Sequence, residues 1–114
     1  MSYKRRSRLA RPQRRAPVFA ALGDETRLLL VAKLSGGRPC TISQLTDGSK
    51  LTRQAITKHL RVLERVGIVR NVRHGRESRF EFNPQPIEGM KQYLESVSEQ
   101  WDQALSRLKS FVEN

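Results

Sequence analysis

The residues with the clearest potential chemistry form a polar cluster near the middle of the chain: Thr52, Arg53, Gln54, Thr57, Lys58 and Arg61. An arginine can bind guanine O6 and N7 through two hydrogen bonds, and a glutamine can bind adenine N6 and N7 in the same way. If the segment is helical, Arg53, Gln54 and Thr57 lie in its first turns, the end that enters the DNA major groove. We therefore expect these three to read bases. Phosphate contacts, which position a protein without specifying sequence, are expected from Thr52, Lys58 and Arg61.

Apolar residues on the opposite side predict the helix that positions this cluster. Within Arg53–Val66 they recur at i, i+4 and i+7: Ile56, Leu60 and Leu63. This spacing puts them on one face of a helix. Thr52 can cap the start of the helix, and Gly67 can end it. In an isolated helix the charged face could simply be solvated, so the neighbouring segments decide between the two interpretations.

A second, shorter helix is predicted directly before this one. The stretch Thr41-Ile-Ser-Gln44 matches a capping box, and Asp47-Gly48 supplies turn chemistry after it. A short helix, a turn of a few residues and a longer helix across residues 41–66 is the layout of a helix-turn-helix. In that setting the solvated-face interpretation is the weaker one.

Two β-prone runs follow, Ile68–Arg73 and Ser78–Asn83, on either side of His74-Gly75-Arg76. Phe80 and Phe82 alternate with polar residues, which gives the second strand one apolar face. A hairpin that follows a helix-turn-helix is a wing. We expect its basic side chains to reach a phosphate or the minor groove, and these are Arg73, Arg76 and Arg79.

Further helices are expected on both sides of this unit. Residues 17–35 carry apolar residues at three- and four-residue steps: Val18, Phe19, Leu22, Leu28, Leu29, Ala32 and Leu34. Gly23 interrupts this pattern, and Asp24 can cap a second helix. The expected fold class is therefore mainly α with a small β-hairpin, a winged helix-turn-helix with a C-terminal dimerisation helix.

The last 28 residues, 87–114, hold four heptads with an apolar residue at every a and d position. Such a seam must be buried, either on its own domain or against another chain. We favour a helix that does both, packing partly near Phe19 and partly on the same helix of a second subunit. The expected interface residues are Phe19, Ile87, Met90, Leu94, Val97, Trp101, Leu105 and Leu108.

The basic residues of the chain are concentrated in two regions. The 114 residues include 22 lysines and arginines against 11 acidic residues, a net charge of +11. Residues 1–15 hold seven basic and no acidic residues, and residues 50–79 hold nine against two. This concentration favours a polyanion partner, most simply nucleic acid. We expect a basic disordered arm at 1–15, for which an inert solubilising tail is the alternative, a winged domain at 16–86 and the dimerisation helix at 87–114.

Neither metal chemistry nor catalysis is indicated. The histidines, His59 and His74, have no cysteine or carboxylate at ligand spacing, and a structural metal site needs about four ligands. We expect His59 to be packed or to contact phosphate, and His74 to be exposed. The single cysteine, Cys40, excludes an internal disulfide and fits a reducing compartment; packing is its expected role, with a thiol switch as the alternative. We expect no enzymatic activity, no metal and no cofactor.

Several segments resemble the ArsR/SmtB family of bacterial winged-helix regulators: FAALGDETRLLLVAKL, TISQL, LTRQAITKHLRVLERVGIV and RHGRESRFEFNP, together about residues 17–87. The resemblance implies a homodimer that represses transcription at a palindromic operator, with dimer contacts from the first and last helices. It does not extend to the metal sites of the family's founding sensors. Only Cys40 lies near the position of their cysteine motif, around Thr41–Leu45, and residues 87–114 contain no histidine.

These observations predict a sequence-specific regulator that binds double-stranded DNA. We expect it in the bacterial cytoplasm, associated with the nucleoid when bound to DNA, with no membrane contact. An effector, either a small molecule or a protein, is left open. Two alternatives from other classes also fit the basic surface: a protein-interaction module for an acidic partner, and a protein that coats nucleic acid without sequence preference.

Overall fold

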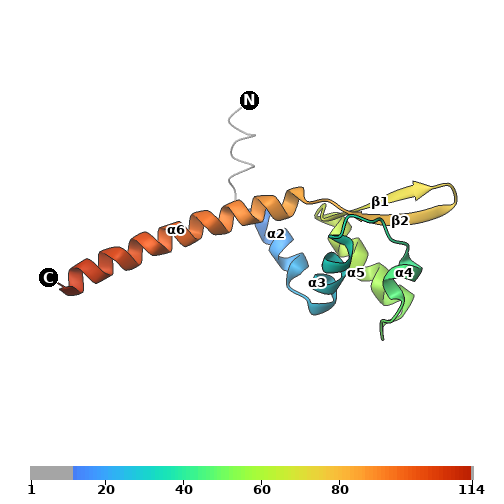
Figure 1. Ribbon diagram of the computed structural model, residues 1–114, viewed down its shortest axis with the longest axis horizontal. Helices are drawn as coiled ribbons and strands as arrows, with labels where there is room; N and C mark the ends of the chain where they lie inside the picture. Colours follow the sequence, from blue (N-terminus) through green and yellow to red (C-terminus); the bar gives the residue numbers. More distant parts are fainter. Residues whose placement is uncertain (1–11, 114) are drawn as a thin grey trace, which may run out of the picture.

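The computed structural model describes the backbone of residues 12–113 and the side chains of residues 15–113. Along the chain the elements are α2 (Pro12–Leu22), α3 (Glu25–Leu34), α4 (Ile42–Thr46), α5 (Arg53–Arg65), β1 (Val69–His74), β2 (Glu77–Phe82) and α6 (Gln85–Glu113) (Figure 1). The predicted fold class, mainly α with a small β-hairpin and a long final helix, is confirmed.

Helix α2 begins earlier than the sequence suggested. Its described part reaches back to Pro12. Residues 12–15 are therefore helical where we expected part of a disordered arm. The rest of that arm, residues 1–11, lies outside the described part of the chain.

The core forms where α5 meets the other elements. The apolar stripe of α5 is buried almost completely, with Ile56 at 2% and both Leu60 and Leu63 at 0% exposure. Helices α2, α3 and α4 and strand β1 all pack against α5. Burying a side chain of this size contributes about 1.5–3 kcal/mol, so these three residues anchor α5 in the fold.

Side-chain caps fix the starts of three helices. The Asp24 carboxylate accepts the Arg27 N–H at 3.0 Å, and Thr52 Oγ1 accepts the Ala55 N–H at 3.1 Å. At α4 the complete capping box is present, because Thr41 Oγ1 accepts the Gln44 N–H while Gln44 Oε1 accepts the Thr41 N–H. Each cap satisfies a backbone donor that the helix leaves unpaired. The helix starts predicted at Asp24, Thr41 and Thr52 are confirmed.

The two strands pair in antiparallel fashion, with Val69 opposite Phe82 and His74 opposite Glu77. Both strands are shifted by about one residue from the predicted ranges, because the connecting turn is only two residues long. Gly75 takes φ +63° at the first turn position, which a type II′ hairpin requires. Cys40 forms an additional backbone bridge to Phe80, so the segment before α4 lies beside the wing.

Helix α3 differs from the pattern used to predict it. Leu28 and Leu29 are more than half exposed, whereas Leu30 and Leu34 are buried and Val31 packs against the core. The run from Leu28 to Val31 consists of four consecutive apolar residues, so apolar spacing alone leaves the rotation of the helix undetermined.

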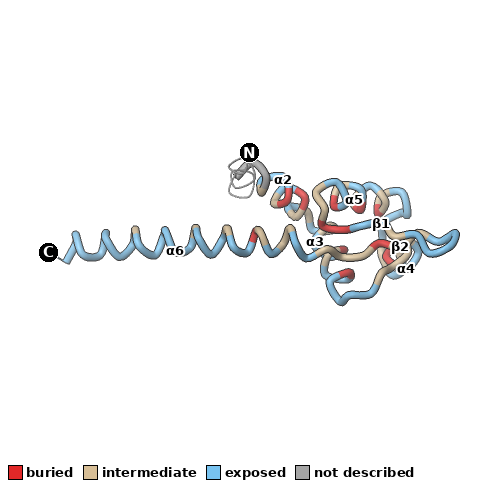
Figure 2. The backbone as a smooth tube through the Cα atoms, turned by 90° about the horizontal axis from the view of Figure 1, so that it is seen from above, coloured by how far each residue is buried: buried red, intermediate tan, exposed pale blue. Residues whose placement is uncertain are grey.

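Only the first half of α6 packs on the domain. Met90 is buried and Ile87 contacts the core, but the large apolar residues farther along are exposed: Leu94, Trp101, Leu105, Leu108 and Phe111. Figure 2 shows the distal half of α6 mostly in the pale blue of exposed residues. The radius of gyration is 18.7 Å, against about 13 Å for a compact chain of this length. The distal half of α6 therefore projects from the domain (Figure 1). Among the described residues, no helix is both long and apolar enough to cross a membrane.

Replacing a leucine in α5 by alanine should cost far more than the same change in the exposed face of α3. We expect Leu60→Ala to lower the free energy of unfolding by about 2–5 kcal/mol, because it opens a cavity in the core. Leu28→Ala, a matched control at a side chain 52% exposed, should cost about 0.5 kcal/mol or less. Urea unfolding followed by circular dichroism measures both, and equal losses would contradict the observed rotation of α3.

Candidate nucleic-acid interface

The first turns of α5 present polar side chains to solvent. Arg53, Gln54, Lys58 and Arg61 are exposed, and Thr57 is half-buried. The Thr57 hydroxyl donates to the Arg53 carbonyl oxygen at 2.7 Å, so it has only an acceptor oxygen and a methyl group left to offer. A methyl group can contact the methyl of thymine. The helix thus displays the Arg53 guanidinium and the Gln54 amide, each able to form two hydrogen bonds, beside the Thr57 methyl group.

Thr52 is the N-cap of α5, as the sequence predicted. Its hydroxyl oxygen caps α5 by accepting the Ala55 N–H, and the hydroxyl hydrogen is still free to donate. A phosphate near the start of α5 could accept that hydrogen, so the cap and a phosphate contact are compatible.

Two shallow depressions adjoin the start of α5. The first is lined by Ile42, Arg53, Gln54, Thr57 and Lys58. The second is lined by Thr41, Ile42, Ser43, Arg53, Arg76, Glu77 and Ser78. Arg53 borders both, and the second depression brings together the start of α4, the start of α5 and the wing. Sequence reasoning missed Thr41 and Ser43 as part of this surface, because the contact between α4 and β2 is visible only in the folded chain.

The wing residues differ in how freely they can bind a ligand. Arg73 and Arg76 are exposed, as expected. Arg79 is half-buried and pairs with Glu77, its Nε and Nη2 atoms each lying 2.8 Å from Glu77 Oε1. Exposed ion pairs of this kind contribute about 0–1 kcal/mol, so a phosphate can compete with Glu77 for Arg79.

A hydrogen-bonded cluster lies behind the interface, where α2, α3 and α5 meet. Arg27 Nη1 lies 3.1 Å from His59 Nδ1, and Asp24 Oδ2 lies 3.7 Å from the same nitrogen. The backbone N–H of Arg27 hydrogen-bonds to Asp24 and, with nearby positive charge, holds the pKa of that carboxyl below its usual value of 3.8. His59 is thus a packed, hydrogen-bonded histidine, and His74 is exposed on the wing. The described residues contain no group of three potential metal ligands.

The expected dimer residues fall into two groups. Some already pack within the subunit: Phe19 meets Tyr93 edge-on with ring centroids 6.2 Å apart, and Met90 lies in the core. Tyr93 also lies beneath the Arg15 guanidinium at 5.1 Å, a contact that the heptad pattern did not indicate because Tyr93 is outside positions a and d. The others are exposed or only half-buried on α6: Leu94, Val97, Trp101, Leu105 and Leu108.

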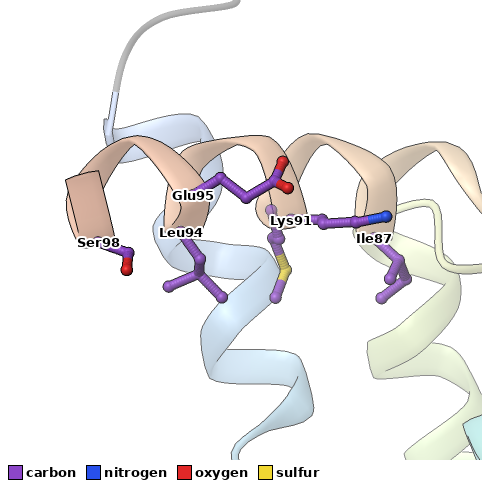
Figure 3. A pocket seen from close by; sticks show the side chains of 6 residues that line it. Ile87, Lys91, Leu94, Glu95 and Ser98 are labelled. Atoms are coloured by element: carbon purple, nitrogen blue, oxygen red, sulfur yellow. The ribbon is translucent and has the colours of Figure 1, made fainter.

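The proximal part of α6 carries an open apolar groove (Figure 3). Its lining residues are Ile87, Met90, Lys91, Leu94, Glu95 and Ser98. All of them come from α6, so the groove runs along one face of this helix, from Ile87 and Met90 at the core to Leu94, which is 49% exposed. Leu94 continues this face toward the distal heptads.

The sequence and fold of this chain are similar to those of known proteins. The sequence model of a family described as a helix-turn-helix domain matches residues 22–72. The chain is 39% identical over 79 residues to YuzN, an HTH-type transcriptional regulator of Bacillus subtilis (strain 168), covering 64% of this chain and 86% of that protein. An ArsR-like transcriptional regulator from Rhodococcus sp. RHA1 has a solved structure with a TM-score of 0.77 and 35% identity, covering 87% of this chain and 92% of that chain.

A more distant structure extends the likeness of fold. It is a homodimeric winged helix-turn-helix DNA-binding domain from Mycobacterium bovis, with a TM-score of 0.61 and 17% identity. The match covers 77% of this chain and 81% of that chain.

The charge on Asp24 should stabilise the fold in a pH-dependent way. Because its pKa is lower in the folded chain than the usual 3.8, the native state favours the ionised carboxylate. The resulting stability is present above that value and is lost as the pH falls through the native pKa. We expect Asp24→Asn, which keeps a good helix cap, to be less stable than the original at pH 7 and equally stable at the acidic end. Urea unfolding of both proteins from pH 7 to pH 2.5 tests this, and a stability gap independent of pH would contradict it.

Proposed function

The chain belongs to the ArsR family of helix-turn-helix transcriptional regulators, and from that premise we propose that it is a homodimeric repressor that binds a palindromic operator. The observation that carries the proposal is the division of α5 into two faces. Ile56, Leu60 and Leu63 are buried, so Arg53 and Gln54 are exposed on the opposite face. Arg53 also borders the wing. A surface of this shape and charge suits the major groove of duplex DNA.

We assign separate roles to the exposed polar residues. Arg53, Gln54 and Thr57 read base edges from the first turns of α5. Backbone phosphates are held by Thr52, Lys58 and Arg61, and the wing reaches phosphate or the minor groove through Arg73, Arg76 and Arg79. The second depression is lined by Ser43, Arg53 and Arg76 among others. We expect one phosphate of the DNA backbone to bind there. The basic residues of the N-terminal arm add affinity that does not depend on sequence.

The uncovered face of α6 supports the proposed dimer. Trp101 is 64% exposed, and a row of large apolar side chains along one helix face is rarely left in water by a soluble monomer. A second copy of α6 would cover that row with the same heptad pattern. Two-fold symmetry would then present two α5 helices to successive major grooves about 34–36 Å apart.

Selection of bound fragments from random duplexes, at physiological salt and without additives, tests the proposed function. We expect a single enriched site with approximate two-fold symmetry, because the dimer presents two identical reading helices. A coating protein would enrich no site. A protein-interaction module would bind DNA without sequence preference. That binding would disappear at physiological salt, since it would depend only on electrostatic attraction to the phosphates.

Gln54→Ala and removal of residues 1–11 should affect DNA binding differently. Gln54→Ala should cost about 1–3 kcal/mol on the selected site and much less on random duplex, because it removes a base contact. Removing the arm should weaken both about equally and flatten the dependence of affinity on salt. Fluorescence anisotropy on both duplexes at several salt concentrations measures this. A change of sequence preference on arm removal would contradict the assigned roles.

A charge at the centre of the distal heptads should break the dimer. Trp101→Glu places a carboxylate in the proposed apolar seam, where it has no partner to offset its lost hydration, so we expect monomers. Gln103→Glu adds the same charge on the exposed α6 outside positions a and d and should leave the dimer intact. Sedimentation equilibrium distinguishes the two, and a stable Trp101→Glu dimer would show that another surface holds the subunits together.

A further inference from the structure

Arg27 connects three helices through its side chain. Its Nε donates to the carbonyl oxygen of Ala21 and its Nη2 lies 3.5 Å from that of Ala20, both at the end of α2. Its Nη1 reaches His59 Nδ1 on α5. We propose that Arg27 is a positioning residue that sets the orientation of α5 relative to α2, and thereby the separation of the two half-sites that a dimer can read. This inference rests on the proposed function.

The end of α2 is a suitable anchor for a guanidinium group. The last carbonyls of a helix lack partners within it and carry partial negative charge. A planar guanidinium offers five donors in a fixed fork, so it can hold Ala20 and Ala21 while another donor points to His59. The end of α2 is held in place because α2 also packs against α6, where Phe19 contacts Tyr93.

His59 lies on α5 next to Leu60, between the base-reading turns and the C-terminal end of the helix. For its Nδ1 to accept from Arg27, the imidazole must be neutral with its proton on Nε2. Asp24, the other charged group near this nitrogen, caps α3 and fixes the first turn from which Arg27 extends. The cluster therefore joins the base-reading helix to the α2–α6 body by directional bonds.

Between the described side chains of α2 and α5 there is no direct hydrogen bond. The two helices otherwise meet through the apolar core that includes Val18 and Ala21. Apolar burial is not directional, so it resists separation of the helices more than small changes in their angle. In a dimer, a change in that angle moves both reading helices at once. Loss of the Arg27 bonds should therefore relax the required spacing of half-sites more than it weakens binding to each half-site.

The test uses the selected operator and two versions with one base pair added or removed at the centre. One base pair shifts a half-site by about 3.4 Å and rotates it by about 34–36°. For the unaltered protein we expect a marked loss of affinity on both shifted operators. In Arg27→Gln that loss should shrink by about three- to tenfold, with the dimer and the half-site preference retained. The control is Arg65→Gln, which removes the same charge from an exposed position at the end of α5 and should keep the full spacing penalty.

Variants of His59 separate positioning from stability. His59→Asn keeps an acceptor near the position of Nδ1 and should keep most of the spacing penalty, whereas His59→Leu removes the acceptor and should relax it as Arg27→Gln does. A variant that only lowers the folded fraction would weaken all three operators equally. An unchanged spacing penalty in Arg27→Gln and His59→Leu would overturn the inference while leaving the regulator intact. If the unaltered protein selects no symmetric site, the proposed function itself fails.

Discussion

The burial of Ile56, Leu60 and Leu63 determines which side of α5 meets solvent. Successive residues of a helix are rotated by about 100°, so turning α5 by one residue would, in one direction, carry Arg61 and Glu64 toward the core. An unpaired buried charge costs far more than the few kcal/mol that each apolar side chain contributes. The apolar spacing therefore fixes the rotation of the helix, and that rotation places Arg53 and Gln54 on the outside. The wing and the two depressions have their positions only relative to this helix.

Features whose evidence lies within a few neighbouring residues could be predicted from the sequence. The caps at Asp24, Thr41 and Thr52 follow from a single side chain and the backbone one turn later. The hairpin follows from alternating residues around Gly75, although the exact pairing depended on the length of the turn. For α5, three apolar residues at helical spacing were sufficient to give both its existence and its exposed face.

Features that depend on contacts between distant segments could not be predicted. The rotation of α3 is ambiguous across Leu28–Val31, and only the folded chain shows that Leu30 rather than Leu29 faces inward. The hydrogen bonds of Arg27 reach carbonyl oxygens of α2 and a histidine 32 residues away in the chain. Likewise, the heptad pattern treats Met90 and Trp101 alike, but one lies in the core and the other projects into solvent.

The projecting half of α6 has a consequence for the life of the protein in a cell. A single subunit exposes a row of large apolar side chains around Trp101. Chaperones, proteases and aggregating chains bind exposed apolar surface of this kind. In the proposed dimer, pairing would bury these residues, and mass action would make pairing depend on the concentration of the protein. Scarce copies would then be degraded faster than plentiful ones, so the amount of active protein would rise more steeply than its rate of synthesis.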